Sequence, residues 1–181
     1  MKLCVLFPGI GYHCDKPLLY YTAKLARSLG YDVIPLKYQG FDVSAKGSEE
    51  KMRSAAELAF KLSEEQLADA DFSAYQRVVF VGKSIGTAAA LRYRAEHGIN
   101  AGTVLFTPLA MTFDCPADGS IAFHGTSDPW VETAALETLC GEQNVPLYKY
   151  PKANHSLETG DVFTDLGCIR EVMGLVSEYL K

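Results

Sequence analysis

The chain has 181 residues, of which 48% are hydrophobic and 22% are charged, and its formal net charge is −5 at pH 7. This composition is typical of a soluble packed protein and argues against disordered, collagen-like and coiled-coil chains. Lysine and arginine form no basic run, so nothing in the sequence favours nucleic acid as a partner.

Short apolar segments alternate with helical patterns along the chain. In chain order we predict strand Lys2–Phe7, helix Pro17–Leu29, strand Asp32–Lys37, helix Glu49–Asp71, strand Arg77–Val81, helix Ser84–His97, strand Thr103–Phe106, strand Ser120–His124, helix Pro129–Glu142, strand Leu147–Tyr150 and helix Asp161–Leu180. The strands are near-continuous apolar runs, typical of strands covered on both faces, and intervening helices favour parallel neighbours. The sequence therefore predicts one α/β domain over residues 1–181, a three-layer sandwich around a parallel sheet.

Two further features bear on the cellular compartment. No uncharged apolar stretch approaches the roughly 18 to 20 residues that a membrane-spanning helix needs, and the first apolar run ends at Pro8 and Gly9, too early for a signal peptide. The five cysteines are scattered and odd in number, which fits neither a disulfide framework nor a zinc site. We therefore expect a cytoplasmic protein with no membrane partner and no metal or other cofactor.

A serine follows the third predicted strand, in the sequence Gly82-Lys83-Ser84-Ile85-Gly86. A serine on a tight turn from strand to helix projects its hydroxyl above the sheet, and flanking glycines allow the close backbone approach that the turn requires. The following N–H, on Ile85, points into the same space. An ordinary glycine-rich turn would have the same pattern, whereas a phosphate-binding loop is excluded because Arg77 stands where that motif needs glycine.

Two more polar residues follow later strands. Asp128 comes just after the fifth predicted strand and His155 just after the sixth. A serine hydroxyl is a weak nucleophile near neutral pH, so it needs a general base, and that base needs an acid that orients it. The carboxyl ends of parallel strands meet at one edge of the sheet, so these residues are candidates for the acid and the base.

These segments resemble the α/β-hydrolase family. Gly82–Gly86 is similar to its nucleophile elbow, His124–Asp128 to its acid loop and Asn154–Ser156 to its histidine loop. The resemblance implies Ser84 as nucleophile, Asp128 as acid and His155 as base, in the chain order that this fold uses. It also implies a reduced fold that lacks the family's first two strands and has six strands in the order 2-1-3-4-5-6.

The family supplies a second oxyanion-binding N–H from the loop after the strand that is first here. That loop reads Phe7-Pro8-Gly9-Ile10-Gly11-Tyr12, with Pro8 in place of the usual histidine. The resemblance therefore implies that Ile10 joins Ile85 in an oxyanion hole, with Gly11 as the near alternative.

The resemblance implies a serine hydrolase that cleaves an ester, thioester or related acyl bond of a small soluble substrate through an acyl-enzyme. A peptidase or an acyltransferase would use the same residues. A non-catalytic member of the fold, which binds a ligand or a partner protein, is the alternative from another class. The sequence leaves the substrate and the oligomeric state open.

Several residues near the predicted loops have two interpretations. Gly11, Tyr12 and Trp130 either line a substrate pocket or only pack against the loops. Lys83 either favours anionic substrates or has its charge solvated beside the sheet. Cys14 is close enough to the predicted oxyanion loop to react if it is exposed.

A neighbouring histidine and a short connecting segment complete the predictions. His124 opens the acid loop, where we expect a structural, hydrogen-bonded histidine rather than the base. His13, Cys14 and Asp15 are adjacent in one loop and do not have the spacing of metal ligands. The segment from Thr107 to Gly119 is too short and too rich in helix breakers for a helical lid, so we expect an open site unless the loop from Gln39 to Glu50 folds over it.

Overall fold

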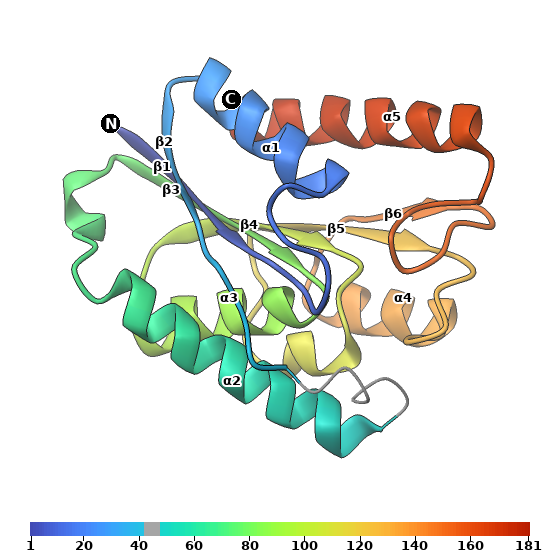
Figure 1. Ribbon diagram of the computed structural model, residues 1–181, viewed down its shortest axis with the longest axis horizontal. Coiled ribbons are helices and arrows are strands. Elements are labelled where there is room, and N and C mark those ends of the chain that lie inside the picture. Colours follow the sequence, from blue (N-terminus) through green and yellow to red (C-terminus); the bar gives the residue numbers. More distant parts are fainter. Residues whose placement is uncertain (42–47) are drawn as a thin grey trace.

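The computed structural model describes residues 1–41 and 48–181, which form a six-stranded sheet between two layers of helices (Figure 1). The strands are β1 (Lys2–Phe7), β2 (Tyr31–Pro35), β3 (Arg77–Lys83), β4 (Ala101–Phe106), β5 (Ser120–Gly125) and β6 (Leu147–Tyr150). All neighbouring strands are parallel and their order is β2-β1-β3-β4-β5-β6. The predicted three-layer sandwich and strand order are confirmed.

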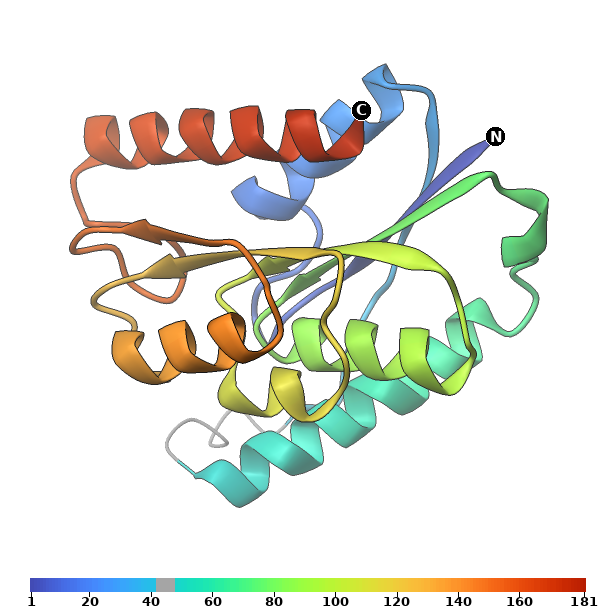
Figure 2. The same cartoon turned by 180° about the vertical axis from the view of Figure 1, so that it is seen from behind.

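Five α-helices of the described residues cover the two faces of the sheet. One face carries α1 (Pro17–Ser28) and α5 (Val162–Leu180), and the other carries α2 (Glu49–Leu67), α3 (Ile85–Glu96) and α4 (Thr133–Glu142), as the front and back views show (Figures 1 and 2). Crossover connections between parallel strands have one hand, so α1, which joins β1 to β2, lies on one face, and α2, α3 and α4, which join strands in the opposite direction along the sheet, lie on the other.

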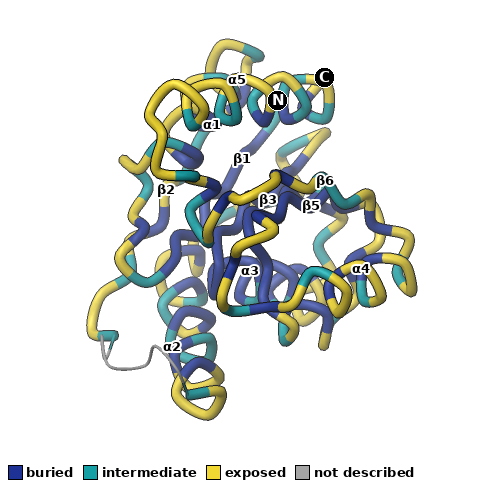
Figure 3. The backbone as a smooth tube through the Cα atoms, turned by 90° about the vertical axis from the view of Figure 1, so that its right-hand side faces the viewer, coloured by how far each residue is buried: buried dark blue, intermediate teal, exposed yellow. Residues whose placement is uncertain are grey.

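The core consists of two apolar clusters, one on each face of the sheet. Consecutive strand residues alternate between them: Leu6 packs toward α1 and α5, whereas Phe7 packs toward α2 and α3. In β3, Phe80 and Val81 divide in the same way, and both are fully buried. Burial on both faces explains why the central strands are continuous apolar runs, and Figure 3 shows them as the most buried part of the chain.

The structure shortens two predicted helices: α2 ends at Leu67 instead of Asp71, and α4 begins late, where the acid loop leaves β5. The prediction of a helix from Pro129 is wrong, because α4 begins at Thr133. The Asp128 carboxylate accepts a hydrogen bond from the N–H of Trp130 at 2.9 Å, which fixes a local turn in this stretch instead of a first helical turn. Two short 3₁₀-helices, η2 (Phe72–Ala74) and η3 (Ala110–Asp114), were not expected from the sequence.

The connection between β4 and β5 contains η3, which packs against α3 and α4. It is the one helical segment described there, so no larger lid is formed by this connection. Part of the loop from Gln39 to Glu50, residues 42–47, lies outside the described residues, so that part of the expectation stays a prediction. None of the helices within the described ranges combines the length and the apolar character that crossing a bilayer requires.

Candidate active site

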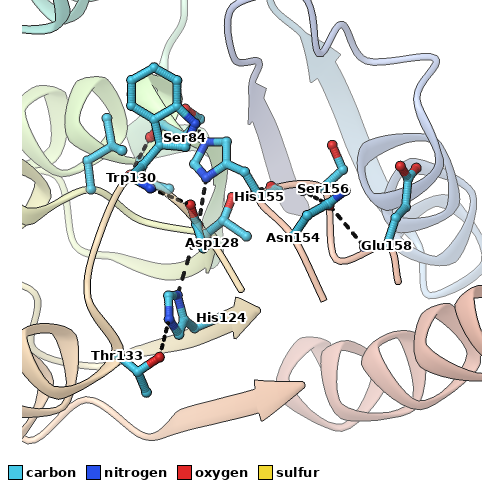
Figure 4. Close-up of polar contacts among 12 residues, drawn as sticks. Ser84, His124, Asp128, Trp130, Thr133, Asn154, His155, Ser156 and Glu158 are labelled. Carbon is cyan, nitrogen blue, oxygen red and sulfur yellow. Dashed lines mark hydrogen bonds and ion pairs between the residues drawn. The ribbon is translucent and has the colours of Figure 1, made fainter. Parts of the chain in front are cut away.

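Three polar side chains from separate parts of the sequence meet at the carboxyl edge of the sheet. Ser84 follows β3, Asp128 follows β5 and His155 follows β6. Figure 4 shows Ser84, His155 and Asp128 in a row, joined by hydrogen bonds. The loops at this edge supply the binding groups in open parallel sheets.

Ser84 occupies a strained turn between β3 and α3. Its backbone dihedrals are φ 57° and ψ −123°, a conformation that side-chain-bearing residues rarely adopt. The turn is held because the Ser84 N–H donates to the carbonyl of Phe106 at 3.0 Å, and the Ser84 carbonyl accepts from the N–H of Thr87 at 2.9 Å. The strain directs the serine side chain out of the sheet toward the loops after β5 and β6.

The two glycines that flank this turn have no room for a side chain. A Cβ on Gly82 would lie 2.6 Å from the Cα of Thr87, and a Cβ on Gly86 would lie 2.1 Å from the carbonyl oxygen of Phe7. Both obstacles are backbone atoms, which cannot rotate away. Gly86 therefore lets the N-terminus of α3 approach the loop after β1.

The serine, histidine and aspartate form one continuous hydrogen-bonded chain. Nε2 of His155 lies 2.8 Å from Oγ of Ser84, and Nδ1 lies 2.7 Å from Oδ2 of Asp128. The Asp128 side chain is fully buried, and its other oxygen accepts the Trp130 N–H. An imidazole held in this way can take the proton of the hydroxyl, while the carboxylate stabilises the imidazolium that results.

The protonation state of His155 fits this arrangement. Burial lowers its pKa below the usual value, the hydrogen bond that it donates to Asp128 works in the opposite direction, and the positive charge of Lys83 lowers the pKa further. The imidazole is therefore neutral near pH 7. A neutral imidazole is the form that accepts a proton.

The loop that carries His155 is held by residues that the sequence pattern did not single out. Oδ1 of Asn154 accepts hydrogen bonds from the N–H groups of Ser156 at 2.7 Å and Glu158 at 3.2 Å (Figure 4). The hydroxyl of Thr107, at the end of β4, donates to the His155 carbonyl at 3.0 Å. Asn154 directly precedes the histidine, and its capacity to bond to backbone two residues ahead is the local signal that could have revealed this role.

His124 lies behind Asp128 as a second buried imidazole. Its Nε2 lies 3.0 Å from the hydroxyl of Thr133, and its Nδ1 lies 4.0 Å from Oδ2 of Asp128 (Figure 4). Burial lowers its pKa, so this ring is neutral as well. The prediction of a structural, hydrogen-bonded histidine is confirmed.

The loop after β1 presents free N–H groups near the serine. Gly9 and Tyr12 bond to each other, N–H to carbonyl in both directions, at 3.0 and 3.2 Å. The N–H groups of Ile10 and Gly11, between them, have no acceptor in the described part of the chain. The N–H of Ile85, the first residue of α3, has no acceptor within its own helix. Both of the sequence-predicted donors, and the near alternative, therefore lie at this edge of the sheet.

A cavity of about 240 Å³ opens beside the serine. Its lining comes from four loops, the end of β3 and one helix: Ile10, Gly11, Tyr12, Met52, Lys83, Ser84, Trp130, His155 and Ser156. The predicted pocket residues Gly11, Tyr12 and Trp130 are among them, and the Trp130 ring centre lies 5.8 Å from that of His155. Their contact with a substrate stays a prediction. Met52 on α2 was missed, because nothing local in its helix indicates which loops that helix will face.

Comparison with known proteins rests on structure alone. No protein-family model matches the sequence, and no curated protein is significantly similar to it. Solved structures match almost the whole chain. A serine hydrolase without a lid from Xanthomonas campestris has a TM-score of 0.65 at 17% identity, with 99% of this chain and 80% of that chain covered.

Two enzymes from other organisms match equally well. An esterase from Pyrococcus furiosus has a TM-score of 0.67 at 15% identity, with 99% of this chain and 82% of the esterase covered. A dienelactone hydrolase from Anabaena variabilis has a TM-score of 0.69 at 19% identity, with 99% and 85% covered. The chain has the α/β-hydrolase fold. At these identities the likeness concerns the fold, and it confirms that part of the resemblance found in the sequence.

Within this α/β-hydrolase fold, the expectation that Lys83 carries a charge solvated beside the sheet is wrong. Its side chain is buried, with only 1% of the residue exposed, and Nζ lies 5.0 Å from the centre of the Tyr12 ring. Burial lowers its pKa to about 7, although the negative charges of Asp128 and Glu158 work in the opposite direction. The alternation of side chains along β3 places Lys83 on the same face as Val81, toward α1.

The loop after β1 in this α/β-hydrolase fold also carries His13, Cys14 and Asp15. Cys14 is half-buried, its Sγ donates to the carbonyl of Leu36 at 3.4 Å, and burial raises its pKa to about 12. The thiol is therefore protonated at neutral pH, and the expectation that it is exposed enough to react is not met. Across the described ranges, no three His, Cys, Asp or Glu side chains come together as metal ligands.

Proposed function

We propose that this protein is a serine hydrolase that cleaves an ester or thioester bond of a small soluble acyl substrate without a cofactor. The observation that carries the proposal is the unbroken chain of hydrogen bonds from Asp128 through His155 to Ser84, with distances of 2.7 and 2.8 Å. A nucleophile, a base and an acid that orients the base are the three parts that acyl transfer by serine requires. The esterase and the dienelactone hydrolase of the same fold support the reaction class.

The proposed reaction begins when the Ser84 hydroxyl attacks the acyl carbonyl and its proton passes to Nε2 of His155. Asp128 stabilises the imidazolium through Nδ1. The oxygen that becomes negative is held by the N–H of Ile85 and that of Ile10 or Gly11. His155 then gives its proton to the departing alcohol or thiol, which leaves an ester on Ser84.

Water completes the cycle by the same steps in reverse order. His155 removes a proton from water, the resulting hydroxide adds to the acyl carbon, and the bond to Ser84 breaks as Oγ takes the proton back. The products are a carboxylic acid and the regenerated serine.

The decisive experiment is to incubate the protein with a fluorophosphonate probe and to locate the adduct by peptide mass spectrometry. We expect a single adduct on Ser84 and none in Ser84→Ala. Ser127→Ala is the matched control, because this exposed serine is next to Asp128 in sequence yet has no bond to His155. An adduct on another serine, or p-nitrophenyl acetate turnover that survives in Ser84→Ala, would contradict the proposal.

The probe experiment, together with two substrate assays, distinguishes the alternatives. A folded protein that does not react with the probe would support a ligand- or partner-binding member of the fold. A peptidase would also cleave matched p-nitroanilides, and an acyltransferase would pass the acyl group to an added alcohol faster than to water. We expect ester cleavage to exceed anilide cleavage, because nothing in the described cavity lining supplies an extended peptide groove.

Three further proposals concern the setting of the activity. We infer one domain, because a single sheet runs through residues 2–150 and α5 packs back onto it through α1. We infer a small-molecule partner from the size of the cavity. The five unpaired, scattered cysteines support a reducing compartment such as the cytoplasm.

A further inference from the structure

Lys83 is a buried cation without a partner. It is the last residue of β3 and directly precedes Ser84. Among the described residues, its Nζ has no hydrogen-bond acceptor and no ion pair, and it lies 5.0 Å from the centre of the Tyr12 ring. Lysine is almost never fully buried unless its charge is paired. The position therefore needs an explanation that packing alone does not give.

The ring of Tyr12 does not compensate for burying the charge. A cation gains free energy over an aromatic face, but removing an ammonium from water costs more than that gain even after the protein relaxes. An apolar residue of similar length would fill the same space without that cost, so the charge itself requires a role.

The cavity beside Ser84 shows where an anion would meet this charge. Lys83 lines that cavity, and no Asp, Glu or Arg does so among the described residues. The two carboxylates whose charges reach Lys83 are otherwise placed: Asp128 bonds to His155 and Trp130, and Glu158 is exposed in the loop after β6. The ammonium thus lacks an acceptor on the side that faces the substrate space.

We propose that Lys83 binds a carboxylate carried by the substrate, so that the preferred substrates are monoesters or monothioesters of short dicarboxylic acids. This inference rests on the proposed function, since it names the substrate class of the same site. Lys83 is next to Ser84 in sequence, and the reach of a lysine side chain is short. The carboxylate that it binds must therefore lie within a few carbons of the carbonyl that Ser84 attacks. A bound carboxylate would replace the missing acceptor and form a charge-assisted hydrogen bond.

The test uses two esters that differ only in charge: the 4-nitrophenyl monoester of glutaric acid and its counterpart with a carboxamide in place of the free carboxylate. We expect kcat/KM of the unmodified protein to favour the anionic ester at least tenfold. In Lys83→Met the ratio should fall to about one or below. Lys16→Met, which removes an exposed lysine at the start of α1, is the matched control and should keep the ratio. Equal rates with the unmodified protein, or an undiminished ratio in Lys83→Met, would overturn the inference.

A binding measurement separates this inference from the proposed hydrolysis. Glutarate should raise the unfolding temperature of Ser84→Ala, and neutral glutaramide at the same ionic strength should not. Binding of glutarate without any ester cleavage would support the anion site and contradict the proposed hydrolase. Ester cleavage that shows no charge preference, in a protein that does not bind glutarate, would support the proposed hydrolase and contradict the anion site. Both measurements on Lys83-containing protein decide the question even if Lys83→Met does not fold.

Discussion

Nδ1 of His155 lies 2.7 Å from Oδ2 of Asp128, and the Asp128 side chain has no exposed surface. A buried carboxylate in this position fixes the orientation of the imidazole and compensates its positive charge. The hydrogen bond between these two residues therefore has a larger expected effect on catalysis than on folding.

We predict that Asp128→Asn keeps the fold and lowers kcat by about 10⁴, by analogy with other triads. Steady-state ester hydrolysis, with circular dichroism as the folding control, measures both effects. Glu158→Gln and Asp161→Asn are matched controls near the same loop: Glu158 is exposed, and Asp161 caps α5 by accepting the Thr164 N–H at 2.8 Å. A loss below tenfold in Asp128→Asn, or a comparable loss in either control, would identify another acid.

Gly86, two residues after Ser84, supplies a second prediction. A Cβ on Gly86 would lie 2.1 Å from the Phe7 carbonyl and 2.5 Å from that of Pro8, so Gly86→Ala must push α3 away from the loop after β1. We expect it to lower both kcat and the unfolding temperature. Gly174→Ala in α5 is the matched control, because nothing lies within 4 Å of its Cβ, and it should stabilise by about 0.5–1 kcal/mol. Full activity in Gly86→Ala would show that the close approach is not needed.

The sequence could locate the site because its three side chains are marked locally. Ser84, Asp128 and His155 each follow a strand that is recognisable as an apolar run, and parallel strands bring their carboxyl ends together whatever the details of packing. The strand order followed from the family resemblance, since alternation of strands and helices by itself does not determine which strands are neighbours.

The features that escaped the sequence depend on contacts between distant segments. Lys83 could be judged solvated or functional from its chemistry alone, and only its position opposite Tyr12 from another loop decides that it is buried. Met52 lines the cavity from the first turn of α2, and helical periodicity does not specify which loops that turn will face. The late start of α4 reflects one hydrogen bond from Trp130 to a side chain whose main role lies elsewhere.

The buried lysine makes stability depend on pH in a defined direction. Burial lowers the pKa of Lys83 from 10.5 to about 7, so between these values the unfolded chain binds a proton that the folded chain does not. The free energy of unfolding contributed by this group therefore rises with pH across that window, and below about pH 7 the full cost of the buried charge remains. We predict that Lys83→Met is more stable than the unmodified protein by a few kcal/mol at pH 7.

The pH dependence of that difference is the sharper test. The amount by which the free energy of unfolding of Lys83→Met exceeds that of the unmodified protein should shrink steadily as the pH rises from 7 to 10. The reason is that, at higher pH, folding releases the lysine proton at less cost. Chemical unfolding at pH 7, 8.5 and 10 measures it, and Lys16→Met provides the baseline for losing an exposed charge. Burial is the largest influence on the pKa of Lys83, and the negative charges of Asp128 and Glu158 oppose it. An advantage that is constant with pH would mean that Lys83 is not charged differently in the two states.

The small cavity and the short connection after β4 together predict a preference for short acyl chains. The cavity of about 240 Å³ beside Ser84 is lined mainly by loops, and the connection from Thr107 to Gly119 forms only η3, which packs against α3 and α4. The cavity itself therefore has room for only a short acyl chain. Each CH₂ that stays in water forgoes roughly 0.8 kcal/mol of binding free energy.

We predict that kcat/KM rises little beyond the first members of a p-nitrophenyl ester series and falls beyond about four to six acyl carbons. The reason is that the added carbons lie outside the cavity, where they gain no transition-state stabilisation. The series from acetate to palmitate, measured below and above the concentration at which the long esters form micelles, tests this directly. Rates that climb through the long chains, or activation by micelles, would require an apolar acyl tunnel or a lid over Ser84.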